Sequence, residues 1–188
     1  MFAVVIPLFL VTAAPVAAQT ALVEWQELAI PSVCTLRIAV PQGWSAELHS
    51  PLEGAVHVRI TPNGAPTAEV LITGLAAVGD RALKGAGDIK RAAREMGEEM
   101  LPGSVERKLV LERVDGVDGT GFLYSLTDKR PSLPEGGFRH MTQGIMAVGP
   151  LRLAVTVLAE SPASPAKAMA FDLLRTAECE VAPPEPKR

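Results

Sequence analysis

The chain has 188 residues, 48% of them hydrophobic and 4% aromatic, and its 18 Lys and Arg against 21 Asp and Glu give a formal net charge of −3. A slightly acidic chain has no electrostatic attraction for a phosphate backbone, which excludes nucleic acid as the expected partner. The few aromatic rings argue against a stacking surface for bases or sugars, and the length suits one domain with a substantial core.

The N-terminal segment, residues 1–18, contains no charged side chain and ends in small residues after an apolar run that Pro7 interrupts. This layout is typical of a secretory signal peptide. We predict cleavage between Ala18 and Gln19 and a periplasmic or secreted mature chain. A membrane anchor is the alternative, but the apolar run is shorter than the roughly 20 residues that span a bilayer, so we expect no stable membrane insertion after cleavage.

Alternating apolar and polar residues predict three strands in the first half of the mature chain. These strands cover residues 33–40, 56–60 and 68–73. Turns are expected at 41–44 (PQGW) and 62–64 (PNG), where Pro, Asn and Gly favour tight bends. In the second strand His57 and Arg59 share one face, which we expect to be solvated.

A helix is expected next, with Asp88 as its N-cap and apolar residues at helical spacing as far as Met100. Pro102 and Gly103 end it. Residues 83–87 contain two glycines and are expected to form a loop before it.

Four more strands are predicted in the second half, at residues 105–114, 121–127, 138–148 and 151–160. A loop at 128–137 separates the second and third of them, and Gly149 and Pro150 form the turn of the last hairpin. Residues 151–160 are apolar on both faces, which is typical of a strand in the middle of a sheet.

A second helix is predicted to begin with Ser164 as N-cap and Pro165 at its first position. Cys179 follows it directly. The tail 182–188, with three prolines and mixed charges, is expected to be disordered.

The two cysteines, Cys34 and Cys179, lie near opposite ends of the mature chain. In an oxidising compartment an isolated pair forms a disulfide, and closing so long a loop stabilises the fold by about 5 kcal/mol in the chain-entropy model. A redox-active or metal-binding pair is the alternative, but it favours a C-x-x-C spacing or a neighbouring His, and the sequence has neither.

The order of elements predicts a single α+β domain over 19–181, an antiparallel sheet with helices on both faces in an α/β/α sandwich. A family resemblance rests on the strand-turn 38–44 (IAVPQGW), the mid-chain helix, the turn 114–119 (VDGVDG), the strand 153–158 and the closing helix. In these segments the chain resembles the PsbP-like family, which includes the extrinsic protein of the photosynthetic oxygen-evolving complex, a Ran-binding nuclear-import factor and bacterial envelope proteins. The resemblance implies a small domain that binds a partner and has no shared active site.

The stretch 115–121 (DGVDGTG) is the most motif-like part of the chain. A calcium loop needs acids two apart and a closing Glu, and a dinucleotide loop needs G-x-G-x-x-G between a strand and a helix. Neither pattern is present, so we interpret the stretch as a tight hairpin.

The histidines lie on three separate segments, which does not predict a metal site. His57 and Arg59 are weak candidates for a shallow anion-binding surface, together with Arg139 and His140. Ordinary exposed strand residues are the simpler interpretation.

The sequence contains no G-x-S-x-G motif, so an enzyme is expected only if scattered residues converge in space. The leading hypothesis is a non-catalytic exported domain that binds another envelope protein or stabilises an assembly, without a cofactor. The alternatives are a periplasmic small-ligand carrier and a hydrolase with an unrecognised site. A deep apolar pocket would favour the carrier, whereas a flat apolar patch would favour a protein partner.

Overall fold

The fold is that of a computed structural model, which describes residues 23–30, 33–49, 55–64, 67–77, 83 and 85–181. The predicted signal peptide with its cleavage site and the predicted tail at 182–188 lie outside the described residues.

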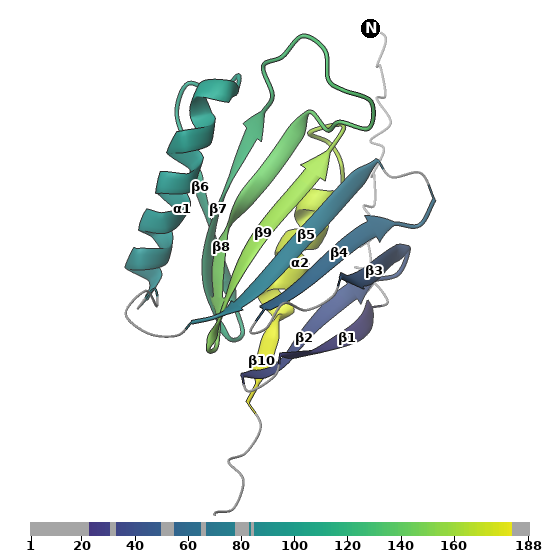
Figure 1. Cartoon of the computed structure of the whole chain (residues 1–188), viewed down its shortest axis with the longest axis vertical. Helices are drawn as coiled ribbons and strands as arrows, with labels where there is room; N and C mark the ends of the chain where they lie inside the picture. The colour runs from purple at the N-terminus through teal and green to yellow at the C-terminus, as the bar shows by residue number, and fades with distance from the viewer. Residues whose placement is uncertain are drawn as a thin grey trace, which may run out of the picture.

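Ten strands in the described part of the chain form two antiparallel sheets (Figure 1). The large sheet has the order β3-β4-β5-β9-β8-β7-β6, and the small sheet has the order β1-β2-β10. The strands are β1 (Val23–Ile30), β2 (Cys34–Pro41), β3 (Trp44–His49), β4 (Ala55–Pro62), β5 (Ala68–Ala76), β6 (Leu111–Gly116), β7 (Gly119–Thr127), β8 (His140–Val148), β9 (Leu151–Ala159) and β10 (Glu178–Glu180). The helices are α1 (Ala86–Met100), a short 3-10 turn η2 (Leu101–Gly103) and α2 (Ala166–Thr176).

Strand β9 lies at the centre of the large sheet, between β5 and β8. This confirms the position predicted from its two apolar faces. Leu151, Leu153, Val155 and Val157 are buried on one face, while the residues between them are half-buried on the other. A strand covered unequally on its two faces still needs apolar residues on both.

The two helices pack on different sets of sheet residues. Ile89 and Ala93 of α1 pack with Phe122 and Ile145, whereas α2 joins the main core, which contains Leu123 and the buried residues of β2. In Figure 1, α1 lies at the left of the large sheet, next to β6 and β7, and α2 lies behind β5 and β9. The α+β class predicted from the sequence is confirmed, with the small sheet as an unexpected second sheet beside α2.

The helix starts differ from the predictions. Helix α1 begins at Ala86 with Gly85 as N-cap, so the predicted N-cap Asp88 is wrong; its carboxylate accepts a 2.6 Å hydrogen bond from Arg91 instead. Helix α2 begins one residue later than predicted, and the Ser164 hydroxyl still accepts a hydrogen bond from the Ala166 amide at 3.3 Å.

Three strands were not anticipated, namely β1, β3 and β10, and two predicted strands begin at least two residues later than expected. Strand β6 begins at Leu111, and residues 105–110 before it are irregular. Strand β8 begins at His140, so Phe138 belongs to the preceding loop.

The predicted disulfide between Cys34 and Cys179 is confirmed, with a Cα–Cα distance of 5.7 Å. It joins β2 to β10, which also pair as strands. The stretch 115–121 forms the β6–β7 hairpin, and its Asp118 carboxylate accepts a hydrogen bond from the Cys179 amide at 3.0 Å. The hairpin that resembled a ligand loop therefore anchors the end of the domain.

Candidate functional site

An apolar groove opens at one end of the large sheet, where α1 ends and the β7–β8 loop begins. Its floor consists of Leu126, Met141 and Leu158, which are cross-strand neighbours on β7, β8 and β9. They lie on the sheet face that α1 covers, since Phe122 and Ile145 of the same strands pack under the helix. The cavity has a volume of about 380 Å³.

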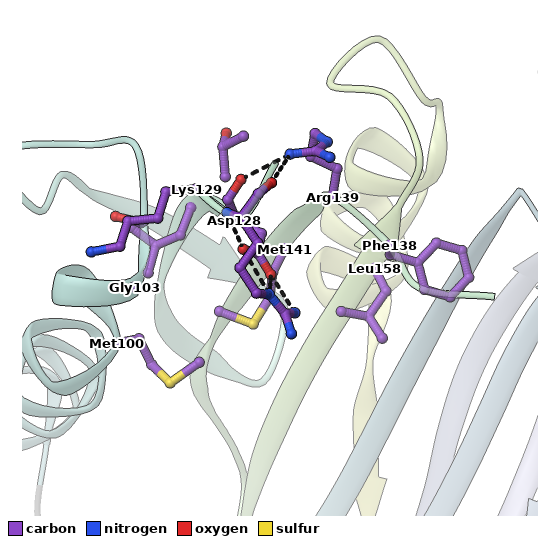
Figure 2. A pocket seen from close by; sticks show the side chains of 12 residues that line it. Met100, Gly103, Asp128, Lys129, Phe138, Arg139, Met141 and Leu158 are labelled. Atoms are coloured by element: carbon purple, nitrogen blue, oxygen red, sulfur yellow. Dashed lines mark hydrogen bonds and ion pairs between the residues drawn. The ribbon is translucent and has the colours of Figure 1, made fainter. Parts of the chain in front are cut away.

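The two sides of the groove come from distant parts of the chain. Figure 2 shows Met100 at the end of α1 on one side, Phe138 and Leu158 on the other, and Met141 between them. The Met100 side is open to solvent, with 47% of that residue exposed. Thioether side chains adapt their shape to what they contact, so this floor suits an apolar group of variable shape.

The wall above the floor is the loop at 128–139, which Arg139 holds in place. The Arg139 guanidinium donates to the carbonyl oxygens of Asp128 at 3.2 Å, Arg130 at 2.9 Å and Pro131 at 3.4 Å. In the other direction, the Asp128 amide donates to the Arg139 carbonyl at 2.9 Å. These bonds close the base of the loop, so the positive charge of Arg139 has a fixed position.

Asp128 and Arg130 form an ion pair on the same loop. The Arg130 Nε donates to the two Asp128 carboxylate oxygens at 3.1 and 2.8 Å, and the Arg130 amide donates to one of them at 2.8 Å. These hydrogen bonds from Arg130 lower the pKa of Asp128 to about 2. Asp128 is therefore ionised at neutral pH and compensates the charge of Arg130.

Lys129 ties the loop to the turn after α1. Its ammonium donates to the Pro102 carbonyl, and its amide donates to the Gly103 carbonyl at 3.2 Å. Carbonyl oxygens accept hydrogen bonds without neutralising the charge. Among the residues that the structure describes, no carboxylate forms an ion pair with Lys129 or Arg139, so three cations against one carboxylate give the groove a net charge of +2.

A smaller polar notch of about 220 Å³ lies at the same end, on the opposite face of the sheet. Ser125 and Thr142 pair through their hydroxyls at 2.8 Å, and His140 Nδ1 lies 3.3 Å from Thr127 Oγ1. The Glu106 carboxylate accepts a hydrogen bond from the Thr127 amide at 2.8 Å. Nucleophilic catalysis needs a hydroxyl bonded to a base. The Ser125 and Thr142 hydroxyls contact each other, and the Thr127 hydroxyl is the one of these that contacts His140, at a long 3.3 Å.

The pKa of Glu106 is lowered, although desolvation by burial, the largest single influence, acts to raise it. Hydrogen bonds from Thr127 and Ser104 to the carboxylate outweigh that burial. A general acid at neutral pH needs a raised pKa, so Glu106 is suited to anchoring the start of the 128–139 loop by its contact with Thr127.

The four candidates from the sequence lie in three places. Arg139 lines the groove and His140 lines the notch. His57 and Arg59 share one face of β4, as expected; His57 Nδ1 lies 2.8 Å from Thr73 Oγ1, and Arg59 forms an ion pair with Glu69 at 2.8 Å. Neither the groove nor the notch includes His57 or Arg59, and an anion-binding role for the four stays a prediction.

Sequence reasoning missed the groove floor and two of its three cations, Lys129 and Arg130. One signal was available, namely the grouping of basic residues around the 128–137 loop in a chain with net negative charge. The floor gave no signal because Leu126, Met141 and Leu158 follow patterns that are also typical of core residues.

The described residues contain no group of three or more His, Cys, Asp or Glu side chains arranged to hold a metal ion. Within the same part of the chain, neither helix is long and apolar enough to cross a membrane.

No protein-family model and no curated protein matches the sequence. Among solved structures, the chain is similar to cyanobacterial PsbP (CyanoP) from Synechocystis, with 13% identity and a TM-score of 0.46, over 87% of this chain and 94% of that one. It is also similar to a protein from Bacteroides thetaiotaomicron, with 15% identity and a TM-score of 0.45, over 78% of this chain and 45% of that one, so it spans less than half of that protein's length. One of these two similar structures is thus a PsbP, which belongs to the family that the sequence resembles.

Proposed function

We propose that this chain is a non-catalytic exported domain, an α/β/α sandwich, that binds another envelope protein through the groove on Leu126, Met141 and Leu158. The observation that carries the proposal is the apolar groove itself, which opens to solvent at Met100 and has a fixed, positively charged wall. Apolar surface that a folded chain leaves accessible in a concave site favours a binding role.

The open side of the groove favours a protein partner over a carried small molecule. Carrier pockets of roughly 300–1,000 Å³ bury most of their ligand; this groove, at about 380 Å³, falls within that range, but one of its sides is open to solvent. It accommodates one or two side chains of a larger molecule whose remainder lies outside. The two methionines of the groove, Met100 and Met141, favour the same interpretation because they repack around different contacts.

Export agrees with the disulfide, since a buried structural disulfide persists in oxidising compartments and is rare in the cytosol. Sequencing the N-terminus of the native protein tests this part of the proposal. We expect it to begin at Gln19, and a native chain that begins at Met1 would contradict export with cleavage.

The binding role is tested by site-specific photo-crosslinking in the cells that make the protein. A photoreactive residue at Met100 should yield one discrete crosslinked product, and the same residue at Val110, which is 60% exposed and does not line the groove, should not. The captured protein is then purified and mixed with the mature chain, and a one-to-one complex is expected by light scattering. Equal labelling from both positions, or a captured protein that forms no complex when purified, would refute the groove as the binding surface.

A further inference from the structure

The groove combines an apolar floor with two cations that form no ion pair with a described carboxylate. The floor residues Met141 and Leu158 lie on adjacent strands, and Lys129 and Arg139 lie on the loop above them. Both cations are held by backbone carbonyls, so their positions are set before any ligand arrives. A preorganised charge loses little side-chain entropy when it binds an anion.

We propose, resting on the proposed function, that the groove selects an acidic, aliphatic segment of its protein partner, with an aliphatic side chain on Met141 and Leu158 and a carboxylate facing Lys129 and Arg139. Charge complementarity argues for this occupant. The groove has a net charge of +2 although the whole chain has a net charge of −3, so it attracts anions locally on a molecule that repels them overall.

The pair of Asp128 and Arg130 limits what the groove accepts. The Asp128 carboxylate already accepts four hydrogen bonds from Arg130, so it is not available to pair with the cation of a basic segment. Such a segment would also meet Lys129 and Arg139 as like charges. Discrimination therefore comes from repulsion of basic segments as well as attraction of acidic ones.

The test follows the NMR signals of the methionine methyl groups. In protein labelled at the methionine methyls, Met100 and Met141 report from the groove, whereas Met146 and Met169 are buried in the main core and serve as internal controls. The first probe is a blocked peptide of alternating leucine and aspartate. Matched probes replace aspartate with lysine or leucine with serine, and dodecanoate represents a free amphiphile.

We expect the leucine–aspartate peptide to shift the Met100 and Met141 signals saturably at one to one, while the signals of the two core methionines stay in place. Each matched peptide should bind at least about tenfold more weakly, equivalent to one decade in Kd. Lys129→Gln should weaken the leucine–aspartate peptide about two- to fivefold, as expected for one exposed ion pair. Lys108→Gln, an equal change of charge at an exposed site that does not line the groove, should leave binding unchanged.

The inference is overturned if the lysine peptide binds as tightly as the aspartate peptide, if Lys108→Gln and Lys129→Gln have equal effects, or if no peptide shifts the two signals. Binding of dodecanoate without binding of the peptide would overturn it in favour of a small amphiphile. These failures are distinguishable from failure of the proposed function, because the crosslink from Met100 captures a partner segment whatever its charge. A captured segment without Asp or Glu would keep the groove as an interface and overturn its acidic selectivity.

Discussion

The hydroxyl group of Tyr124 provides a test of the fold, because its pKa depends on its burial. Tyr124 is the only tyrosine of the chain and is fully buried, and its hydroxyl donates to Gln143 Oε1 at 2.6 Å. Gln143 Nε2 in turn donates to Thr156 Oγ1 at 3.1 Å. Burial, and secondarily the charge of Glu99, raise the pKa of Tyr124 from 10.0 to about 12.

This shift has a definite sign for stability. The unfolded chain loses the tyrosine proton near pH 10, whereas the folded chain keeps it until about pH 12. The folded state therefore binds more protons over that interval, so the free energy of unfolding falls as the pH rises. At 1.36 kcal/mol per pH unit, the two units correspond to a total loss of about 3 kcal/mol, most of which falls between pH 10 and 12.

Tyrosinate absorbance in the ultraviolet measures the titration directly, because a single group contributes. We expect a midpoint near pH 12 in the native protein and near pH 10 in concentrated urea. Urea unfolding curves, followed by the fluorescence of Trp25 and Trp44, give the free energy of unfolding at each pH.

Tyr124→Phe serves as the matched control. It should cost about 1 kcal/mol at neutral pH, because the half-buried Gln143 side chain loses its donor. It should also flatten the dependence of stability on pH between 10 and 12. A native midpoint near pH 10, or an equally steep alkaline loss of stability in Tyr124→Phe, would refute the assignment of a buried, hydrogen-bonded hydroxyl.

Three further predictions concern backbone contact and the disulfide end of the domain. Gly144→Ala would place a Cβ 2.1 Å from the Phe122 carbonyl oxygen and force β7 and β8 apart, so we expect a loss of about 3 kcal/mol in the free energy of unfolding or no folded protein. As a control, Gly87→Ala lies at an exposed helix position where the new Cβ meets nothing within 4 Å, and it should stabilise the fold by about 0.5–1 kcal/mol. Equal effects of the two substitutions in urea unfolding would contradict the close approach at Gly144. Replacing both cysteines with alanine should cost about 2–5 kcal/mol, measured by thermal unfolding with and without reductant, and only the parent protein should respond to the reductant. Asp118→Asn should cost about 1 kcal/mol because the Cys179 amide loses a charged acceptor, and faster amide hydrogen exchange at Cys179 is the expected sign; unchanged exchange there would contradict the bond.

The sequence predicted those parts of the fold whose signal is local. The apolar run 151–160 indicated a central strand because a strand that is covered on both faces has apolar residues at consecutive positions. Strand β1 has no such apolar pattern, since only Leu28 and Ile30 of its eight residues are buried. Strand β10 has three residues, which is too short for any periodicity to show.

The candidate groove could not be predicted because its parts meet only in space. Met100 ends a helix, while Leu126 and Leu158 belong to strands that are separated by a third strand. Leu126 and Leu158 alternate along their strands as core residues do, so nothing in the pattern distinguishes the uncovered end of a sheet from its covered middle. The position of α1, which ends at Met100, makes that distinction.

The pairing of β2 with β10 has a consequence for the order of events as the chain is made. Strand β2 is synthesised early, but its edge partner and the thiol that bonds to Cys34 arrive more than a hundred residues later. A chain that emerges from its N-terminus must therefore keep Cys34 unpaired until residue 179 has followed. Formation of the disulfide therefore records that the chain has been made as far as residue 179; under the export that we propose, it also records that Cys34 and Cys179 have reached the same side of the membrane.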